Sequence, residues 1–317
     1  MNVSIIIVNY NTKQLLADCL TSIYAQTKDI EFEVIVSDNG STDGSIEMLK
    51  VNFPQVVLIE NNANLGFGAA NNRGLAIAKG KYIFYLNSDT ILLNNAVKIF
   101  FDYWERYGEE KNIGGLGCNL KDEKGNIVHS YNETPNGFYK CAADSISNLK
   151  YLCKSSYKTA VKHLILRRQL RKIPNEKGIY EKHIGEVGTI VGADLFLRND
   201  SFAKFDERFF MYCEEDDLLL QITRTGKKWY LIEGPEILHL EGGSAEKIHY
   251  EVLDQAIFCN LNYLLSQIIF YKKNNLATKK ELRTIKKLTF LFWLNPLLYS
   301  KTKPYIKRLV KEWHTTF

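Results

Sequence analysis

The chain has 317 residues, of which 45% are hydrophobic, 24% charged and 12% aromatic, a composition that fits a soluble globular protein and excludes a membrane bundle or a disordered chain. Its length favours one large domain with an appendage, and its net charge of +5 is less basic than a nucleic-acid-binding protein usually requires. Residues 267–317 hold 12 Lys or Arg and two acids, so this tail carries +10 and the rest −5, which predicts an anionic surface as the partner of the tail.

The first hundred residues alternate strand and helix patterns. Residues 3–8 are typical of a buried strand, and this run is too short for a signal peptide. Further strands are expected at 32–37, 56–60 and 81–86, and helices at 15–26, 43–52 and 69–78. This order predicts a parallel sheet with helices on both faces, in which ligands bind beyond the carboxyl ends of the strands.

The second half is less regular. We expect strands at 113–118 and 189–198, a hairpin over 119–129, a helix at 214–225, and short strands at 229–232 and 236–240. Residues 149–172 hold eight Lys or Arg and no acid, which predicts a basic amphipathic helical excursion. From about residue 247 onward the pattern is helical, with a break at Pro296.

Hydropathy and cysteine spacing speak against a membrane-spanning protein and against a zinc or redox protein. No stretch reaches the roughly 18 apolar residues of a membrane-spanning helix. The six cysteines show no C-x-x-C spacing, which speaks against zinc and redox motifs. We therefore expect buried free thiols in a reducing cytoplasm.

Polar loops follow all four N-terminal strands, at residues 9–12, 38–45, 61–68 and 87–90. One loop of Asn, Asp, Gly and Ser needs no explanation, because these residues form turns and helix caps. Four of them at the same edge of a sheet favour a polar ligand-binding crevice.

Two acids in these loops have a chemical interpretation. Asp38 can accept the imide N–H of uracil or thymine, although the alternative is a turn cap. Asp89, in the run Asn-Ser-Asp at 87–89, can hold a divalent cation that bridges two phosphates. The alternative for Asp89 is an N-cap of the helix that is expected to begin near Asn94.

Two features of the second half suggest catalysis. The four acids at 214–217 repel one another, which raises at least one pKa and prepares a general base. The alternative is a favourable contact of these acids with the helix dipole. His239 ends a strand and is followed by Gly242 and Gly243, so it can approach a metal or a phosphate, or it is an ordinary buried histidine.

Taken in order, these motifs resemble the family 2 inverting glycosyltransferases with the A-type fold, and within them the rhamnosyltransferase-like branch. The resemblance covers roughly residues 1–245. Seven segments carry it: 8–11, 34–45, 64–72, 86–90, 192–198, 209–218 and 239–244.

The resemblance implies a fold and a domain organisation. The fold is α/β, with a Rossmann-like, mostly parallel sheet flanked by helices. Residues 1–245 are the catalytic domain, with a nucleotide-sugar-binding half at 1–118 and an acceptor-side half at 119–245 that contains the insertion 149–172. Residues 246–317 form a helical, basic and amphipathic C-terminal extension.

The resemblance also implies the ligands of the predicted crevice. The nucleotide-binding residues are Asn9, Asp38, Asn64, Asn72 and Ser88. Asp89 and His239 are the implied ligands of Mg²⁺ or Mn²⁺ at the diphosphate. The family usually has Asp where this chain has Asn87, so metal binding depends on one carboxylate and on the diphosphate.

Glu215 is the implied general base, at a position where the family usually has Asp. Glu214 and Asp217 are the alternatives, and Asp194 is placed near the donor sugar or the acceptor. The implied reaction is a single displacement, in which the acceptor hydroxyl attacks the anomeric carbon, Glu215 takes its proton and the configuration inverts.

The donor expected first is dTDP-rhamnose, with a UDP- or dTDP-linked hexose as the alternative. The acceptor is a surface polysaccharide or a lipid-linked glycan. Aromatic and basic residues of the tail predict peripheral binding to the anionic inner face of the cell membrane, and the alternatives are a solvated basic face or a partner protein.

Three other classes of protein fit less well. A nicotinamide dehydrogenase would need a third glycine after Gly66 and Gly68. A non-catalytic sugar- or membrane-binding scaffold would not need Asp89 and Glu215. Nucleic-acid binding would need an aromatic platform, whereas aliphatic residues interrupt the basic segments.

Overall fold

The computed structural model describes residues 1–132, 180–240 and 252–293. The predicted excursion at 149–172, residues 241–244 of the last motif and the tail beyond residue 293 lie outside the described residues. The chain divides into two units, of which the first comprises Met1–Gly137 and Lys177–His249. The second comprises Phe138–Glu176 and Tyr250–Phe317. The functional division at residue 245 stays a prediction.

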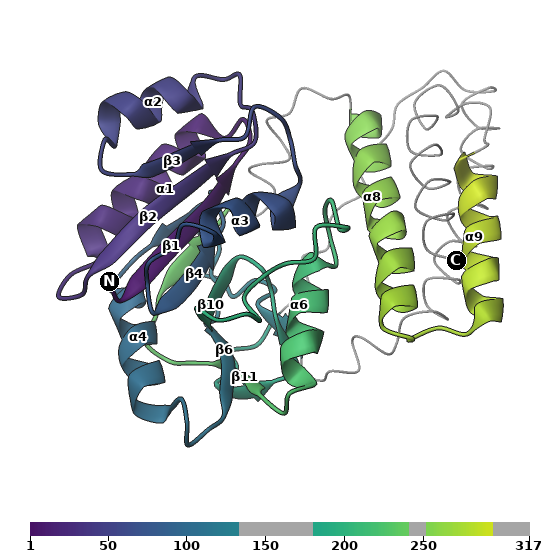
Figure 1. Cartoon of the computed structure of the whole chain (residues 1–317). Coiled ribbons are helices and arrows are strands. Elements are labelled where there is room, and N and C mark those ends of the chain that lie inside the picture. Colours follow the sequence, from purple (N-terminus) through teal and green to yellow (C-terminus); the bar gives the residue numbers. More distant parts are fainter. Residues whose placement is uncertain (133–179, 241–251, 294–317) are drawn as a thin grey trace. The chain divides into compact units, whose positions relative to one another are not determined.

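An eight-stranded sheet forms the centre of the first unit (Figure 1). Its strands lie in the order β3 (Val57–Glu60), β2 (Phe32–Asp38), β1 (Val3–Asn9), β4 (Tyr82–Leu86), β10 (Asp194–Arg198), β6 (Ile113–Gly117), β11 (Lys228–Leu231) and β8 (Gly185–Val187). The first four in this order are parallel, whereas β10 runs antiparallel to both of its neighbours, β4 and β6. The predicted mostly parallel sheet is confirmed.

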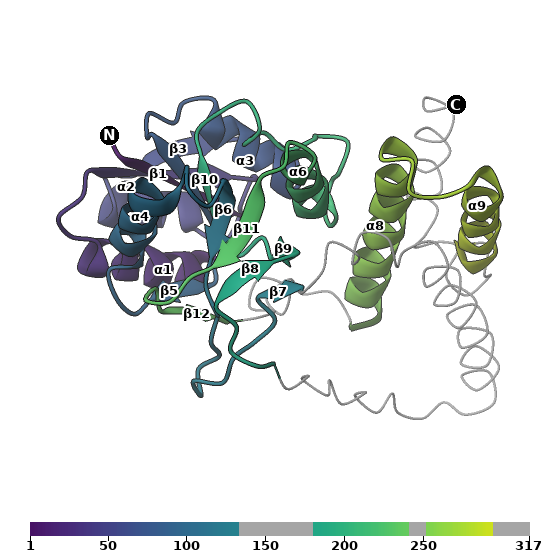
Figure 2. The same ribbon diagram turned by 90° about the horizontal axis from the view of Figure 1, so that it is seen from below.

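Helices cover both faces of this sheet (Figure 2). On one face the apolar stripe of α1 (Lys13–Gln26) joins Ile5 and Ile7 of β1 in the buried core, together with α4 (Ala96–Tyr107). On the other face α3 (Phe67–Leu75) brings Gly74 against the side chain of Ile6. Successive strand residues point to opposite faces, so the alternation of Ile5, Ile6 and Ile7 fixes which helix lies where.

Two small sheets complete the first unit. β5 (Thr90–Leu92) pairs with β12 (Ile237–His239), and β7 (Tyr131–Asn132) pairs with β9 (Thr189–Ile190). The strand character expected over 189–198 is confirmed as two strands, β9 and β10, which belong to different sheets and are separated by a turn at Gly192 and Ala193. The expected hairpin is confirmed by the antiparallel bridge of Lys121 with Ile127.

The described part of the second unit contains two helices, α8 (Val252–Lys273) and α9 (Lys279–Trp293). The start of α9 is a capping box, in which the N–H of Glu281 donates to Thr278 Oγ1 and the N–H of Thr278 donates to Glu281 Oε2. The helical pattern expected after residue 247 is confirmed over these residues. Neither these helices nor any other in the described ranges is long and apolar enough to span a bilayer.

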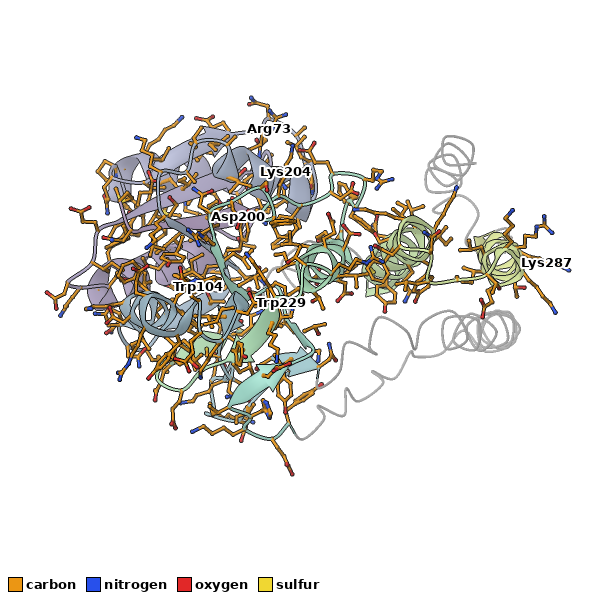
Figure 3. The ribbon with its side chains drawn as sticks, turned by 60° about the horizontal axis from the view of Figure 1, so that its bottom comes forward. Arg73, Trp104, Asp200, Lys204, Trp229 and Lys287 are labelled. Atoms are coloured by element: carbon orange, nitrogen blue, oxygen red, sulfur yellow. The ribbon has the colours of Figure 1, made fainter. Side chains whose placement is uncertain are left out.

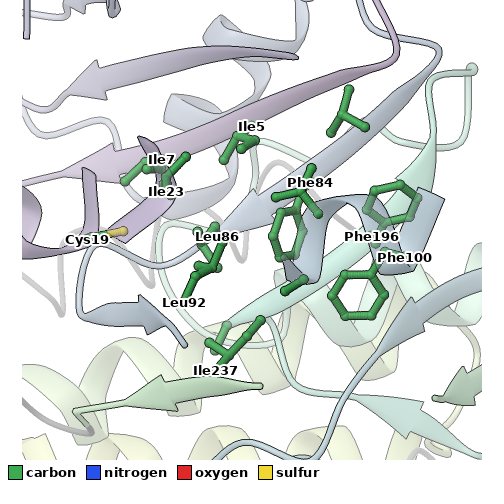
Figure 4. Packing of buried hydrophobic residues seen from close by; sticks show 14 of the residues in the cluster. Ile5, Ile7, Cys19, Ile23, Phe84, Leu86, Leu92, Phe100, Phe196 and Ile237 are labelled. Atoms are coloured by element: carbon green, nitrogen blue, oxygen red, sulfur yellow. The ribbon is translucent and has the colours of Figure 1, made fainter. Parts of the chain in front are cut away.

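An aromatic cluster fills the core between α4 and the sheet (Figure 4). Phe196 of β10 has no exposed surface, and its ring lies 5.3–6.1 Å from four others, those of Tyr82, Phe84, Phe100 and Trp104. Close-packed rings of this kind add to the stabilisation from apolar burial. Phe196 thereby anchors the strand that begins with Asp194.

A close backbone contact joins the loop after β3 to the segment before α6 (Glu214–Thr223). The N–H of Phe67 donates to the carbonyl oxygen of Phe210 at 3.0 Å. Gly66 has φ +87°, and a methyl group added to it would collide with that same oxygen. Only glycine permits both the backbone angle and the approach.

Asn72 of α3 makes a second connection to the same segment. Its Nδ2 donates to the carbonyl oxygen of Phe205 and to Glu207, and its Oδ1 accepts the N–H of Phe205. Both amide hydrogens of this buried side chain are thereby used. Asn72 anchors the chain that leads to α6, and its contact with a nucleotide stays a prediction.

Phe196→Ala should lower the free energy of unfolding by about 3–5 kcal/mol, because it removes a ring from a filled core. Phe202, which is 40% exposed, offers a matched control. Phe202→Ala should change the same quantity by only about 0.5 kcal/mol. Urea unfolding measures both, and equal losses would contradict this assignment of the core.

Gly66→Ala should lower the free energy of unfolding by more than about 2 kcal/mol, since strain at a positive φ adds to the collision with Phe210. Gly125 has φ +80° and nothing within 4 Å of an added methyl group. Gly125→Ala should therefore cost only about 1 kcal/mol for the backbone angle alone. If urea unfolding finds the two variants alike, the contact with Phe210 does not constrain the loop.

Candidate active site

Asn9, at the carboxyl end of β1, holds the first two loops together. Its Nδ2 donates to Asp38 Oδ2 at 2.7 Å and to Ser41 Oγ at 3.0 Å, and its Oδ1 accepts the hydroxyl of Thr12 at 2.6 Å. The side chain has no exposed surface. Asn9 therefore lies behind the surface of the predicted crevice, where it orders the loops.

Asp38 is buried at the end of the neighbouring strand β2. Its Oδ1 accepts the N–H groups of Gly40 and Ser41, at 3.0 and 2.8 Å, while Oδ2 accepts the amide of Asn9. This is the turn-capping arrangement that the sequence left open as an alternative. Any contact with a nucleobase would add to a carboxylate that already accepts three hydrogen bonds.

The third loop is joined to the second by Asn39, whose role in the network the sequence did not indicate. Its Nδ2 donates to the carbonyl oxygen of Gly66 at 3.1 Å and approaches Asn64 Oδ1 at 3.4 Å, and its Oδ1 accepts from Asn61. Asn64 Oδ1 also accepts the N–H of Gly66. Asn64 is half-buried, and its Nδ2 donates to no described residue, so this group is available to a ligand.

The loop after β4 meets the first loop through two hydroxyl groups. Thr12 Oγ1 lies 3.1 Å from Ser88 Oγ. Asp89 follows, with 3% of its surface exposed. The four polar loops thus form one connected edge, as their positions after the strands predicted.

Asp89 and His239 come together although they are 150 positions apart in the chain. The pairing of β12 with β5 sets His239 opposite Thr90, and the N–H of Leu240 donates to the carbonyl oxygen of Asp89. His239 Nε2 then lies 3.5 Å from Asp89 Oδ1. One carboxylate and one imidazole suit Mg²⁺ or Mn²⁺ when substrate phosphates supply the remaining ligands. Across the described ranges no cluster of three or more His, Cys, Asp or Glu could hold a metal without such help.

Asp194 begins β10 opposite Leu86, at the same edge of the sheet. It has no exposed surface, and its Oδ2 accepts the N–H of Cys118 at 2.8 Å. Its Oδ1 accepts no hydrogen bond from any described residue. Burial raises the pKa of this carboxyl to about 7.

The acids at the start of α6 have strongly raised pKa values. Burial, and then the charge of Glu214, raise the pKa of the Glu215 carboxyl to about 8. Burial raises the pKa of Glu214 to about 7, and burial with the charges of Glu215 and Asp217 raises that of Asp216 to about 7. The expectation that this cluster raises at least one pKa therefore agrees with the structure. The half-buried Glu215 is the member of the cluster that combines partial exposure with the highest value.

The other two candidates on α6 are more enclosed. Glu214 is 3% exposed, and its Oε2 has no hydrogen-bond partner in the described part of the chain. Asp217 has no exposed surface, and its Oδ2 accepts the side-chain amide of Gln221 at 2.6 Å. Enclosure makes both less accessible to an acceptor hydroxyl than Glu215 is.

An unusual backbone turn directs Glu215. Tyr212 and Cys213 have φ values of +71° and +63°, a left-handed conformation that is rare in residues with side chains. Helix α6 begins directly after it, with Glu215 against Gly192. A methyl group added to Gly192 would lie 3.5 Å from Glu215 Cβ, and the next residue, Ala193, accepts the N–H of Asn87. Glu215 therefore lies beside the Gly192–Ala193 turn. This turn precedes Asp194 in the chain and is hydrogen-bonded to the loop that contains Asp89.

Comparisons with known proteins identify the family and the fold that this chain resembles. Residues 4–150 match the model of glycosyl transferase family 2. Over 249 residues the chain is 26% identical to N-acetylglucosaminyl-diphospho-decaprenol L-rhamnosyltransferase of Mycobacterium tuberculosis, an alignment that covers 74% of this chain and 75% of that enzyme.

Two further proteins are similar over part of their length or in fold. The chain is 35% identical over 121 residues to poly(ribitol-phosphate) beta-glucosyltransferase of Bacillus spizizenii, which covers 37% of this chain and only 19% of that relative. The mannosyltransferase PcManGT of Pyrobaculum calidifontis, solved with GDP-Man and Mn²⁺, is similar in fold alone, with a TM-score of 0.50, 14% identity and coverage of 98% of this chain and 75% of that one. By its motifs, its sheet and these matches, the chain contains a glycosyl transferase family 2 domain over residues 4–150 and has the glycosyltransferase A-type fold.

Proposed function

We propose that the protein transfers a sugar from a nucleoside-diphosphate sugar to a hydroxyl group of a lipid-linked or polysaccharide acceptor, in the synthesis of a cell-surface glycan. The observation that carries the proposal is the meeting, at one edge of the sheet, of four interlocked polar loops, the Asp89–His239 pair and Glu215. The name of the mycobacterial relative, which specifies a diphospho-decaprenol-linked acceptor, supports the choice of acceptor.

The nucleotide would lie over the loops that follow β1, β2 and β3. Asn64 Nδ2 is the donor there that no described residue uses, and it suits a carbonyl of a pyrimidine ring. Asn9 and Asp38 would not touch the nucleotide directly. Their hydrogen bonds would hold the loop backbone in the conformation that accepts it. Ser88 and Asp89 would lie toward the diphosphate.

Asp89 and His239 would hold Mg²⁺ or Mn²⁺ against the diphosphate. Bound there, the cation would neutralise negative charge on the departing group. The Mn²⁺ in the mannosyltransferase of similar fold supports a divalent cation for this chain. Since Asn87 supplies no second carboxylate, the affinity of the two residues for the cation should depend strongly on the nucleotide.

Glu215 would act as the general base of an inverting displacement. With a pKa of about 8, its carboxyl retains a proton over much of the neutral range, and its deprotonated form is a stronger base than an ordinary carboxylate. Glu215 would take the proton from the acceptor hydroxyl while the acceptor oxygen attacks the anomeric carbon. In such a single displacement the oxygen approaches from the face opposite the departing nucleotide. Asp194 begins β10 directly after the Gly192–Ala193 turn. Because it has no exposed surface, it would lie near the donor sugar or the acceptor but behind the surface that they contact, where it would hold this turn in place.

Rhamnose from dTDP-rhamnose is the donor that we propose first, because the relative aligned over three quarters of both chains is a rhamnosyltransferase. A UDP-linked hexose is the alternative, which the glucosyltransferase relative supports. With a lipid-linked acceptor, the reaction would take place at the inner face of the cell membrane.

Glu215→Gln should abolish detectable transfer while leaving nucleotide binding intact, because it removes the base and keeps the shape of the side chain. In the unaltered enzyme, kcat/KM should rise with pH up to about 8, since the base acts deprotonated and burial raises its pKa. Asp216→Asn, on the same turn, is the matched control and should retain transfer. Normal transfer by Glu215→Gln would show that another group is the base.

A nucleotide sugar should raise the melting temperature by a few degrees when it saturates the folded protein, and Mn²⁺ should increase this shift. A thermal-shift screen of dTDP-rhamnose and UDP-glucose, with and without Mn²⁺, makes the measurement. Asp89→Asn should lose the increment due to Mn²⁺, whereas Asp18→Asn, an exposed carboxylate on α1, should keep it. If no nucleotide stabilises the protein, the proposed function fails.

A further inference from the structure

One side of helix α9 carries a compact group of cations. Lys279, Lys280, Arg283 and Lys287 are all exposed. At 3.6 residues per turn these four positions fall within an arc of about 100° around the helix axis. We call these four residues the α9 basic face.

The apolar side of α9 points elsewhere. Leu282 and Ile285 are buried, 6% and 1% exposed, and they lie about 110° and 170° around the helix from the middle of the basic face. Lys287 extends from α9 on the side away from α8 (Figure 3). Helix α9 therefore buries the side that carries Leu282 and Ile285, and it exposes the α9 basic face on a different side.

The charges of the α9 basic face are not neutralised by the described part of the chain. None of its four cations lies within ion-pair distance of a described carboxylate, unlike Lys50, Lys81 and Lys98 of the first unit. The only acid of α9, Glu281, is used at its start, where its Oε2 accepts from the N–H and the hydroxyl of Thr278. Four adjacent cations with no described carboxylate beside them repel one another, and an anionic surface against them would relieve this repulsion.

We propose that the α9 basic face binds the anionic headgroups of a phospholipid bilayer. A row of cations on one side of a helix matches a flat surface of negative charge, and each such cation strengthens binding to an anionic leaflet about fivefold. Nucleic acid is less favoured, because the face contains no aromatic side chain on which a base could stack. The proposal rests on the proposed function in one respect only, that a lipid-linked acceptor requires the enzyme at a membrane.

The test is co-sedimentation of the full-length protein with vesicles of phosphatidylcholine alone or with added phosphatidylglycerol. The protein should bind the vesicles that contain phosphatidylglycerol, and high salt should release it. Reversing the four charges of the α9 basic face to Glu should weaken this binding by at least about 100-fold. Replacing Lys279, Lys280 and Lys287 by Arg should leave it unchanged.

A charge-matched control distinguishes an effect of the α9 basic face from an effect of the protein's net charge. Lys28, Lys79, Lys124 and Lys204 are exposed residues of the first unit, and changing all four to Glu alters the net charge by the same amount. This variant should keep its vesicle binding, and circular dichroism should show that both charge-reversed proteins are folded. Should the reversed α9 protein be unfolded, changing the same four residues to Gln provides the comparison, with binding again expected to be lost.

Four outcomes would overturn the proposal: no binding of the unaltered protein to vesicles that contain phosphatidylglycerol, equal losses in the two charge-reversed proteins, equal binding to phosphatidylcholine alone, or tighter binding of a single-stranded RNA than of vesicles through the same four residues. The vesicles contain neither nucleotide nor acceptor. Failure to bind them therefore leaves sugar transfer to a water-soluble acceptor unaffected, and the two proposals fail separately.

Discussion

The buried hydrogen bond from the Asn9 amide to the Asp38 carboxylate is the interaction on which the candidate site depends. A buried carboxylate without partners would cost several kcal/mol, so the chain surrounds it with donors from Asn9, Gly40 and Ser41. Those donors belong to the loops after β1 and after β2, so the shared carboxylate fixes the two loops relative to each other. Through Thr12 and Ser88 the network extends to the loop of Asp89, so the polar loops at this edge of the sheet are connected to one another.

A second constraint brings in residues from far along the chain. The register of β12 against β5 carries His239 to Asp89, and the break at Gly192 makes room for Glu215 beside the same segment. Gly66 and Asn72 fasten the chain before α6 to the loop after β3. A change in the nucleotide loops would therefore also displace the proposed base. The loop after β3, which we propose contacts the nucleotide, and the chain that leads to Glu215 are therefore in direct contact.

Local patterns sufficed to predict the four N-terminal strands, their parallel order and the polar edge, because each depends on hydrophobic periodicity and on turn residues. The contacts made by Asn9, Asp38 and Asn72 could not be predicted in the same way. Loop residues of these types serve equally well as ligands or as internal hydrogen-bonding groups, and only the three-dimensional arrangement separates the two. The pairing of β5 with β12 joins short strands 150 positions apart, and no local pattern signals it. Resemblance to a family supplied the pairing of Asp89 with His239 before the structure explained it.

We propose that nucleotide, cation and acceptor meet at this one edge of the sheet. A crystal structure of Glu215→Gln with an intact nucleotide sugar and Mn²⁺ tests it most directly, because the variant should hold the donor without consuming it. We expect the base over the loops after β1 to β3, the diphosphate and Mn²⁺ at Asp89 and His239, and the anomeric carbon facing residue 215. A nucleotide bound away from these loops, or an anomeric carbon turned away from residue 215, would contradict it.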